Sequence, residues 1–134
     1  MGGHGALTLA LRNPERYRSA SAFSPIVAPS QVPWGIKSFT AYLGEDRETW
    51  KQYDAVALIQ ARDPSTPVLP LLIYQGEADE FLEPQLKSQL LSEACLSAGY
   101  PLQLNLRPSF DHSYYFISSF IDEHVRFHAN YLRI

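Results

Sequence analysis

Asp79 and His112 stand at positions where a catalytic acid and a catalytic base could meet. Asp79 follows the apolar run at residues 71–74, and His112 follows the alternating segment at residues 102–106. One helix and one strand separate the two side chains, so the chain returns to the same edge of a parallel sheet. A carboxylate that orients an imidazole is the arrangement of a general base in nucleophilic catalysis. The order of these strands and side chains along the chain therefore predicts an acid–base pair.

Other acids lie close to Asp79 and His112. Glu77 and Glu80 flank Asp79, and Asp111 directly precedes His112. The alternative to a catalytic acid is a solvated acidic turn, and the alternative for a lone histidine is a structural role. The catalytic interpretation needs a single acid aimed at His112.

Three glycines crowd the start of the apolar segment at residues 5–11. A phosphate-binding loop would need a preceding strand and either G-x-G-x-x-G spacing or a terminal lysine, and this segment offers neither. A better match is the tail of a nucleophile elbow, G-x-S-x-G, with Met1 after the serine and Gly2 as its last glycine. The order elbow, acid, histidine is that of α/β-hydrolases. A glycine-rich helix start without a catalytic role is the alternative.

A metal site is a weaker hypothesis. His124 and His128 are four residues apart, so they share one face of a helix. The glutamate of the H-E-x-x-H zinc motif is missing between them, and we expect no metal site. Cys95 lies in the apolar stripe of its helix and is expected in the core.

Helical and strand patterns alternate along the chain, which predicts a mainly parallel sheet with helices on its faces. We expect that residues 1–134 are the C-terminal part of a single α/β domain that begins just after the position of the nucleophile. Only three strands are expected, so the sheet is expected to be incomplete, with an open edge at residues 19–23. The expected strands are residues 19–23, 71–74 and 102–106, the helices 5–11, 37–43, 54–61, 83–98 and 113–132, and the Pro-rich loops 26–35 and 63–70.

Composition excludes several classes of protein. The 134 residues are 46% apolar and 19% charged, which is typical of a globular domain. A net charge of −3 without a basic cluster argues against nucleic-acid binding. No apolar run approaches the length of about 20 residues that spans a bilayer, and a single cysteine excludes a disulfide framework. We expect a cytoplasmic protein that binds neither membrane nor nucleic acid.

Together these segments resemble the S-formylglutathione hydrolase (esterase D) family over the whole chain. The Asp-His-Ser-Tyr-Tyr-Phe-Ile run at residues 111–117 and the Pro-Trp-Gly loop at residues 33–35 are specific to this family. The other matching stretches are residues 1–7, 22–26, 42–44, 75–76 and 79–82.

The resemblance implies an α/β-hydrolase that cleaves S-formylglutathione to glutathione and formate, a step of formaldehyde detoxification. It implies activity on simple esters, no metal or organic cofactor, and a homodimer when complete. By motif, Asp79 is the triad acid, His112 is the base and Met1 takes the oxyanion-hole position. The family serine would stand immediately before Met1, so no residue here receives that role. Trp34 is expected to line a tight acyl pocket.

The chain departs from the family pattern at two positions. Tyr74 stands where the family has aspartate before Gln-Gly, and Ser109 stands where it has glycine before the histidine turn. Ser109 would strain that turn if the position requires a positive φ. The alternative to a hydrolase is an inactive fragment, or a partial open reading frame, that acts as an interaction module.

Overall fold

Three parallel strands form the centre of the computed structural model, which describes residues 1–133. They are β1 (Ala20–Phe23), β2 (Leu71–Gly76) and β3 (Leu102–Arg107), in the order β1-β2-β3. Both pairs are parallel, which requires crossover connections on the faces of the sheet. The carboxyl ends of β2 and β3 therefore meet at one edge. The parallel sheet with flanking helices predicted from the sequence is confirmed.

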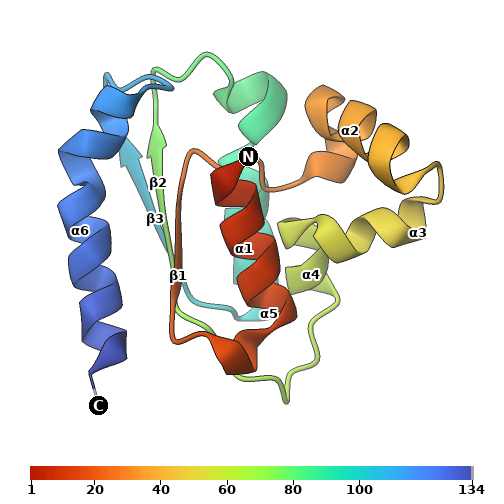
Figure 1. Ribbon diagram of the computed structural model, residues 1–134, viewed down its shortest axis with the longest axis horizontal. Helices are drawn as coiled ribbons and strands as arrows, with labels where there is room; N and C mark the ends of the chain where they lie inside the picture. The colour runs from red at the N-terminus through yellow and green to blue at the C-terminus, as the bar shows by residue number, and fades with distance from the viewer. Residues whose placement is uncertain (134) are drawn as a thin grey trace.

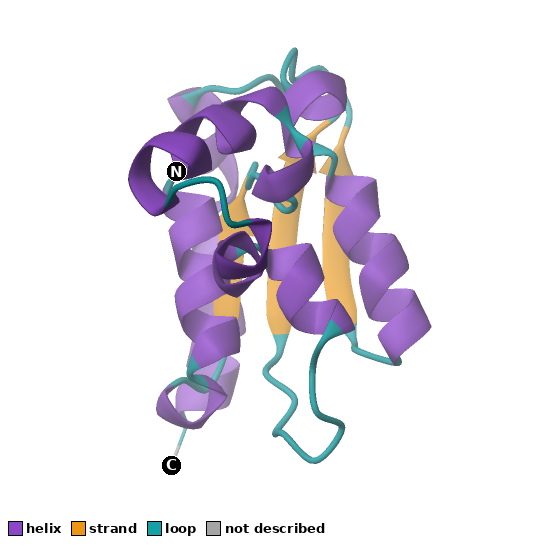
Figure 2. Ribbon diagram, turned by 90° about the vertical axis from the view of Figure 1, so that its right-hand side faces the viewer, coloured by secondary structure: helices purple, strands orange, loops and turns teal. Residues whose placement is uncertain are grey.

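Helices cover both faces of this sheet (Figures 1 and 2). On one face, α1 (Gly2–Arg12), α4 (Ala55–Gln60) and α5 (Ser88–Ala98) enclose the larger core with Leu71 and Ile73. On the other face, α6 (Tyr114–Leu132) packs on Leu72 and Tyr74 through Phe116 and Phe127. All six residues of β2 are buried, as the continuous apolar run at residues 71–74 predicts. Cys95 lies in the larger core, and burial raises the pKa of its thiol to about 11.

The segment after β1 differs from the prediction. Residues 26–35 were expected to be one loop, but α2 (Pro33–Leu43) begins inside it. Proline is tolerated at the first position of a helix because its missing N–H would be unpaired there anyway. The prediction of loop was therefore wrong for Pro33, Trp34 and Gly35, which form the first turn of α2. A four-residue helix, α3 (Arg47–Trp50), was not predicted.

The long helix expected at residues 83–98 is divided in two. A π-helical turn spans Leu82–Leu86, and α5 begins only at Ser88. Between them, Lys87 adopts a left-handed conformation with a φ of 48°, which no continuous α-helix contains. The apolar spacing runs across the break, so periodicity alone could not reveal it.

The remaining boundaries agree with the prediction to within a few residues. Asp54, expected as the first residue of a helix, is instead the N-cap of α4, and its side chain accepts a hydrogen bond from Ala57 N. Within residues 1–133, no helix is both long and apolar enough to cross a membrane.

Candidate active site

The end of β2 positions Asp79 against the loop between β3 and α6. Glu77 N donates to Arg107 O at 2.9 Å, and Ala78 N donates to Phe110 O at 3.0 Å. Gly76 permits this close approach, because a Cβ there would lie 2.2 Å from Phe110 O. The two segments therefore meet through backbone contacts before their side chains are considered.

Asp79 and His112 are hydrogen-bonded. His112 Nδ1 lies 2.8 Å from Asp79 Oδ2, and Asp79 Oδ1 accepts a hydrogen bond from Phe81 N at 2.9 Å. The Asp79 side chain is 0% exposed, whereas the His112 side chain is 43% exposed. With Nδ1 as the donor to the carboxylate, Nε2 of the neutral ring is an acceptor, which is the protonation state that a general base requires.

The turn before His112 contains a backbone position with a positive φ. Ser109 has a φ of 67°, so a residue other than glycine occupies a left-handed position. Ser113 then caps α6 by accepting a hydrogen bond from Phe116 N at 3.4 Å. The ring of Phe81 meets the imidazole of His112 edge-on, with centroids 5.4 Å apart. The imidazole of His112 is therefore positioned by the end of β3, the turn at Ser109 and the capped start of α6.

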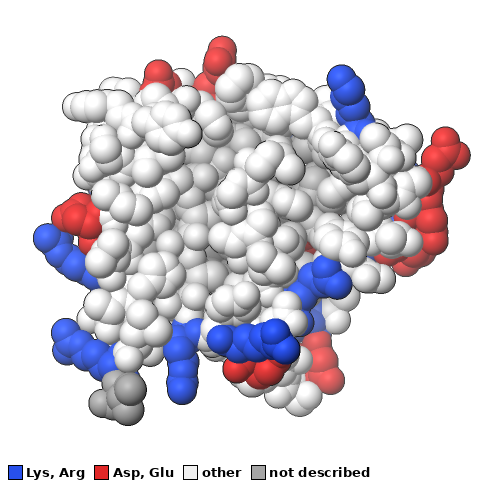
Figure 3. Space-filling view, in the orientation of Figure 1, with Lys and Arg blue, Asp and Glu red and all other residues white. Residues whose placement is uncertain are grey.

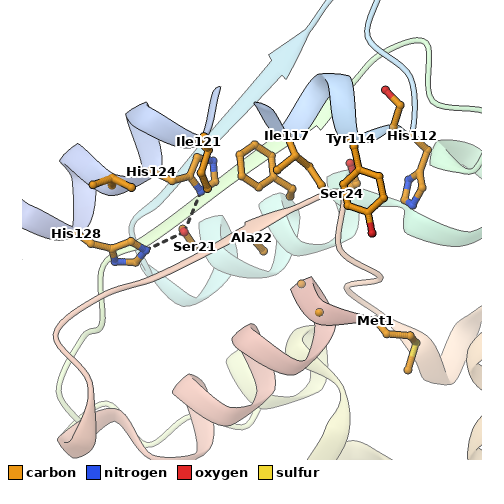
Figure 4. Close-up of a pocket in the computed structure, with 15 residues that line it drawn as sticks. Met1, Ser21, Ala22, Ser24, His112, Tyr114, Ile117, Ile121, His124 and His128 are labelled. Atoms are coloured by element: carbon orange, nitrogen blue, oxygen red, sulfur yellow. Dashed lines mark hydrogen bonds between the residues drawn. The ribbon is translucent and has the colours of Figure 1, made fainter. Parts of the chain in front are cut away.

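A groove of about 680 Å³ runs from His112 along β1, between α1 and α6. Figure 4 shows His112 at one end of it and His128 at the other. Met1, Gly2, Ser24 and Tyr114 line the groove, with Met1 as the N-cap residue of α1. Among residues 1–133, no serine hydroxyl is hydrogen-bonded to His112. The structure thus places Met1, the predicted oxyanion residue, in the same groove as His112, and their catalytic roles stay predictions.

Trp34 lies in a second cavity of about 190 Å³, which also contacts Met1. Its walls include Ile26 and Phe39. The ring of Phe81 links the two sites, since it lies 4.7 Å from the Trp34 ring as well as against His112. This cavity has room for several water-sized groups, and its role as the acyl pocket stays a prediction.

The other acids near the site are exposed. Glu77, Glu80 and Asp111 all face solvent, and the carboxylate hydrogen-bonded to His112 within the described residues is that of Asp79. Asp79 is the buried member of the acidic segment. The geometry therefore favours Asp79 among the four acids as the partner of His112.

His124 and His128 point away from His112 and toward β1. Ser21 Oγ lies 2.9 Å from His124 Nδ1 and 2.8 Å from His128 Nε2, and Ser19 Oγ lies 2.7 Å from His128 Nδ1. Burial, and then the neighbouring His128, lower the pKa of His124 to about 4. Burial also lowers the pKa of His128. Both rings are thus neutral near pH 7 and connect α6 to the sheet.

Three residues of the site were not found from the sequence. Gln75 donates a hydrogen bond to Asp79, Phe81 contacts His112, and Gln85 Oε1 accepts from Trp34 N at 3.0 Å. Gln75 could have been noticed, because an amide inside a fully buried strand needs a partner. Gln85 carried no such signal, since it lies in the π-helical turn Leu82–Leu86, which the apolar spacing does not reveal.

The fold, together with the buried Asp79 carboxylate bonded to the His112 imidazole, defines the protein as an α/β-hydrolase. The chain belongs to the Esterase family, whose pattern matches residues 1–127. It is 48% identical to an S-formylglutathione hydrolase from Agrobacterium tumefaciens, with a TM-score of 0.90 over 98% of this chain and 47% of that one.

More distant structures share the fold. An S-formylglutathione hydrolase from Staphylococcus aureus is 19% identical, with a TM-score of 0.74 over 95% of this chain and 50% of that one. An esterase B from Lactobacillus rhamnosis is 17% identical, with a TM-score of 0.70 over 96% of this chain and 49% of that one. The chain spans about half the length of these three proteins.

Proposed function

We propose that this chain carries the acid–base half of a serine thioesterase that cleaves S-formylglutathione to glutathione and formate. The observation that carries the proposal is the 2.8 Å contact between His112 Nδ1 and the buried Asp79 carboxylate. The 48% identity to an S-formylglutathione hydrolase supports the substrate class. The proposed nucleophile is the family serine, whose place in the family pattern directly precedes Met1.

In this mechanism, His112 Nε2 takes the proton of the attacking serine while Asp79 holds the ring and stabilises its charged form. The acyl group is transferred to the serine, and the thiol leaves with the proton from His112. Water then attacks the acyl-enzyme, with His112 again as base. The N–H of Met1 donates to the oxyanion. No metal or organic cofactor takes part in these steps.

The cavity beside Met1 and Trp34 is the proposed acyl site. Its apolar walls suit an uncharged acyl group, and its volume of about 190 Å³ also admits short acyl chains longer than formyl. We therefore include simple carboxylic esters among the substrates. The complete protein is proposed to be a cytoplasmic homodimer that acts in formaldehyde detoxification.

The test joins the preceding half of an S-formylglutathione hydrolase, ending at the family serine, in frame to Met1. We expect this fusion to hydrolyse S-formylglutathione and p-nitrophenyl acetate, and we expect the same fusion with His112→Ala to lose that activity. The 134 residues alone should show neither hydrolysis nor labelling by a serine-directed fluorophosphonate. A soluble fusion without hydrolysis, or full activity in the His112→Ala fusion, would overturn the proposal.

A second candidate function, an interaction module, is favoured by the open edge of β1. Ala20 N and Ser24 N donate to Pro70 O and Tyr74 O of the β2 side, so the N–H groups of Ser21 and Phe23 face the other edge. The groove lies along that edge, and the face of the molecule that contains it is uncharged at its centre (Figure 3). An apolar strand fits such an edge by strand addition.

Hydrogen exchange tests the second function. If the chain acts as a strand-binding module, adding the complementary half as a separate polypeptide should protect the Ser21 and Phe23 amides. The Ala20 and Ser24 amides, which already donate to the β2 side, serve as the matched control. Unchanged exchange at Ser21 and Phe23 would exclude this function.

A further inference from the structure

The carboxylate of Asp79 is held from three sides. Oδ2 accepts hydrogen bonds from His112 Nδ1 at 2.8 Å and from Gln75 Nε2 at 3.2 Å, and Oδ1 accepts from Phe81 N at 2.9 Å. The backbone donor and the amide donor act on different oxygens, so together they oppose rotation of the carboxylate group. His112 and Gln75 share one oxygen, which couples the amide directly to the imidazole contact.

Gln75 is fully buried, at 0% exposure, within a strand that is otherwise apolar apart from its final glycine. Its Nε2 donates to Gly76 O at 3.0 Å as well as to Asp79 Oδ2, so both amide hydrogens have acceptors. Its Oε1 is buried without a partner among the described residues. An unpaired buried oxygen costs free energy that an apolar side chain of similar length would avoid.

The orientation of the amide follows from electrostatics. A flipped Gln75 would aim Oε1 at the carboxylate of Asp79 and at the carbonyl of Gly76, and both contacts would be repulsive. The observed orientation places the donor group where the negative charge is. Burying the amide of Gln75 in this strand costs free energy. The hydrogen bond that this amide donates to Asp79 explains why the residue is there.

We propose that Gln75 is a positioning residue, whose side-chain amide holds the Asp79 carboxylate in the orientation that meets His112. It acts through Asp79 and does not contact the groove. Its catalytic relevance rests on the proposed function, whereas the contact itself and its test do not require catalysis. The amide keeps Oδ2 at the Nδ1 side of the ring, and the Nδ1–H tautomer depends on that oxygen.

The experiment measures the tautomer of His112 by long-range proton–nitrogen NMR on the 134-residue chain near pH 9, where imidazoles are ordinarily neutral. In the unaltered chain we expect the Nδ1–H form to predominate. In Gln75→Met, which keeps length and loses the donor, the ratio of Nδ1–H to Nε2–H should fall about tenfold, because a carboxylate free to rotate away gives up roughly one net hydrogen bond from Nδ1–H. Ile73→Val, buried in the same strand without a bond to Asp79, is the matched control and should leave the ratio unchanged.

A second measurement does not depend on the folding of Gln75→Met. Asp79→Asn keeps the shape of the acid and removes its charge, so the side-chain amide protons of Gln75 should move upfield and exchange faster. If the amide signals of Gln75 are the same with and without the Asp79 charge, the proposal is wrong. It is equally wrong if Gln75→Met folds and keeps the tautomer ratio, whether or not the fusion protein hydrolyses esters.

Discussion

Asp79 and His112 are hydrogen-bonded across the boundary between the interior and the solvent. The carboxylate side chain is 0% exposed and the imidazole side chain is 43% exposed. The buried partner can therefore orient the ring, while Nε2 stays accessible from the groove that Met1 also lines. This division of roles is what a general base and its orienting acid require.

The first prediction concerns the identity of the acid. In the fusion protein described above, Asp79→Asn should lower kcat by about 10⁴, because an asparagine favours the wrong imidazole tautomer. Glu80→Gln is the matched control, since Glu80 is exposed and its described side chain is not hydrogen-bonded to His112. Steady-state hydrolysis of p-nitrophenyl acetate measures both. A large loss in Glu80→Gln, or in Asp111→Asn, would mean that the acid is wrongly assigned.

The second prediction concerns Gly76. In Gly76→Ala, the added Cβ would lie 2.2 Å from Phe110 O, so the loop that carries His112 must move. A displacement of about 1 Å in a catalytic group costs about 100-fold in rate, and we expect a loss of kcat of this order in the fusion. Gly5→Ala in α1, where an added Cβ meets nothing within 4 Å, should keep full activity. Equal kcat in the two variants would contradict the role of the close approach.

The central strand of this fold could be predicted from the sequence, because burial on both faces of a sheet requires a continuous apolar run. Residues 71–74 are apolar without interruption, and β2 is buried throughout. The helix at residues 83–98 was predicted as one piece because Leu82–Leu86 continues the apolar spacing up to the left-handed Lys87. The π turn depends on tertiary packing, because Leu86 packs against Ile26 and Val32. The local spacing of apolar residues contains no information about such contacts.

The candidate site was predictable where side-chain types mark it. Asp79 and His112 follow strands in an order that brings them to one edge, and they meet there. The sequence predicts Trp34 on a loop because three prolines stiffen residues 26–35, whereas Pro33 is in fact the first residue of α2. The role of Gln75 depends on a 3.2 Å contact between segments, which no spacing rule encodes.

The third prediction concerns acid stability and His124. Its pKa is about 4 in the folded chain, below the ordinary value of 6.5, so the unfolded chain binds the proton first. The free energy of unfolding should therefore be highest above pH 6.5 and fall as pH decreases toward 4, by up to about 3 kcal/mol from this group. Below pH 4 the contribution of His124 stops changing. Urea unfolding at a series of pH values measures this slope.

His124→Gln provides the control for that slope. A neutral glutamine cannot be protonated, so the fall in the free energy of unfolding between pH 6.5 and 4 should become shallower. His128, whose pKa is also lowered by burial, should leave a residual slope in the same direction. An unaltered slope in His124→Gln would show that other groups cause the acid sensitivity.

The fourth prediction concerns the turn that presents His112. Ser109 has a φ of 67°, a conformation that costs a residue with a side chain about 1 kcal/mol relative to glycine. Ser109→Gly should therefore raise the free energy of unfolding by about 0.5–1 kcal/mol, less the greater entropy of glycine in the unfolded chain. Ser92→Gly, at an exposed position inside α5, should lower it by a similar amount, because glycine weakens a helix interior. The opposite signs make the pair diagnostic in thermal unfolding: destabilisation by both substitutions would show that the left-handed turn at Ser109 stores no strain.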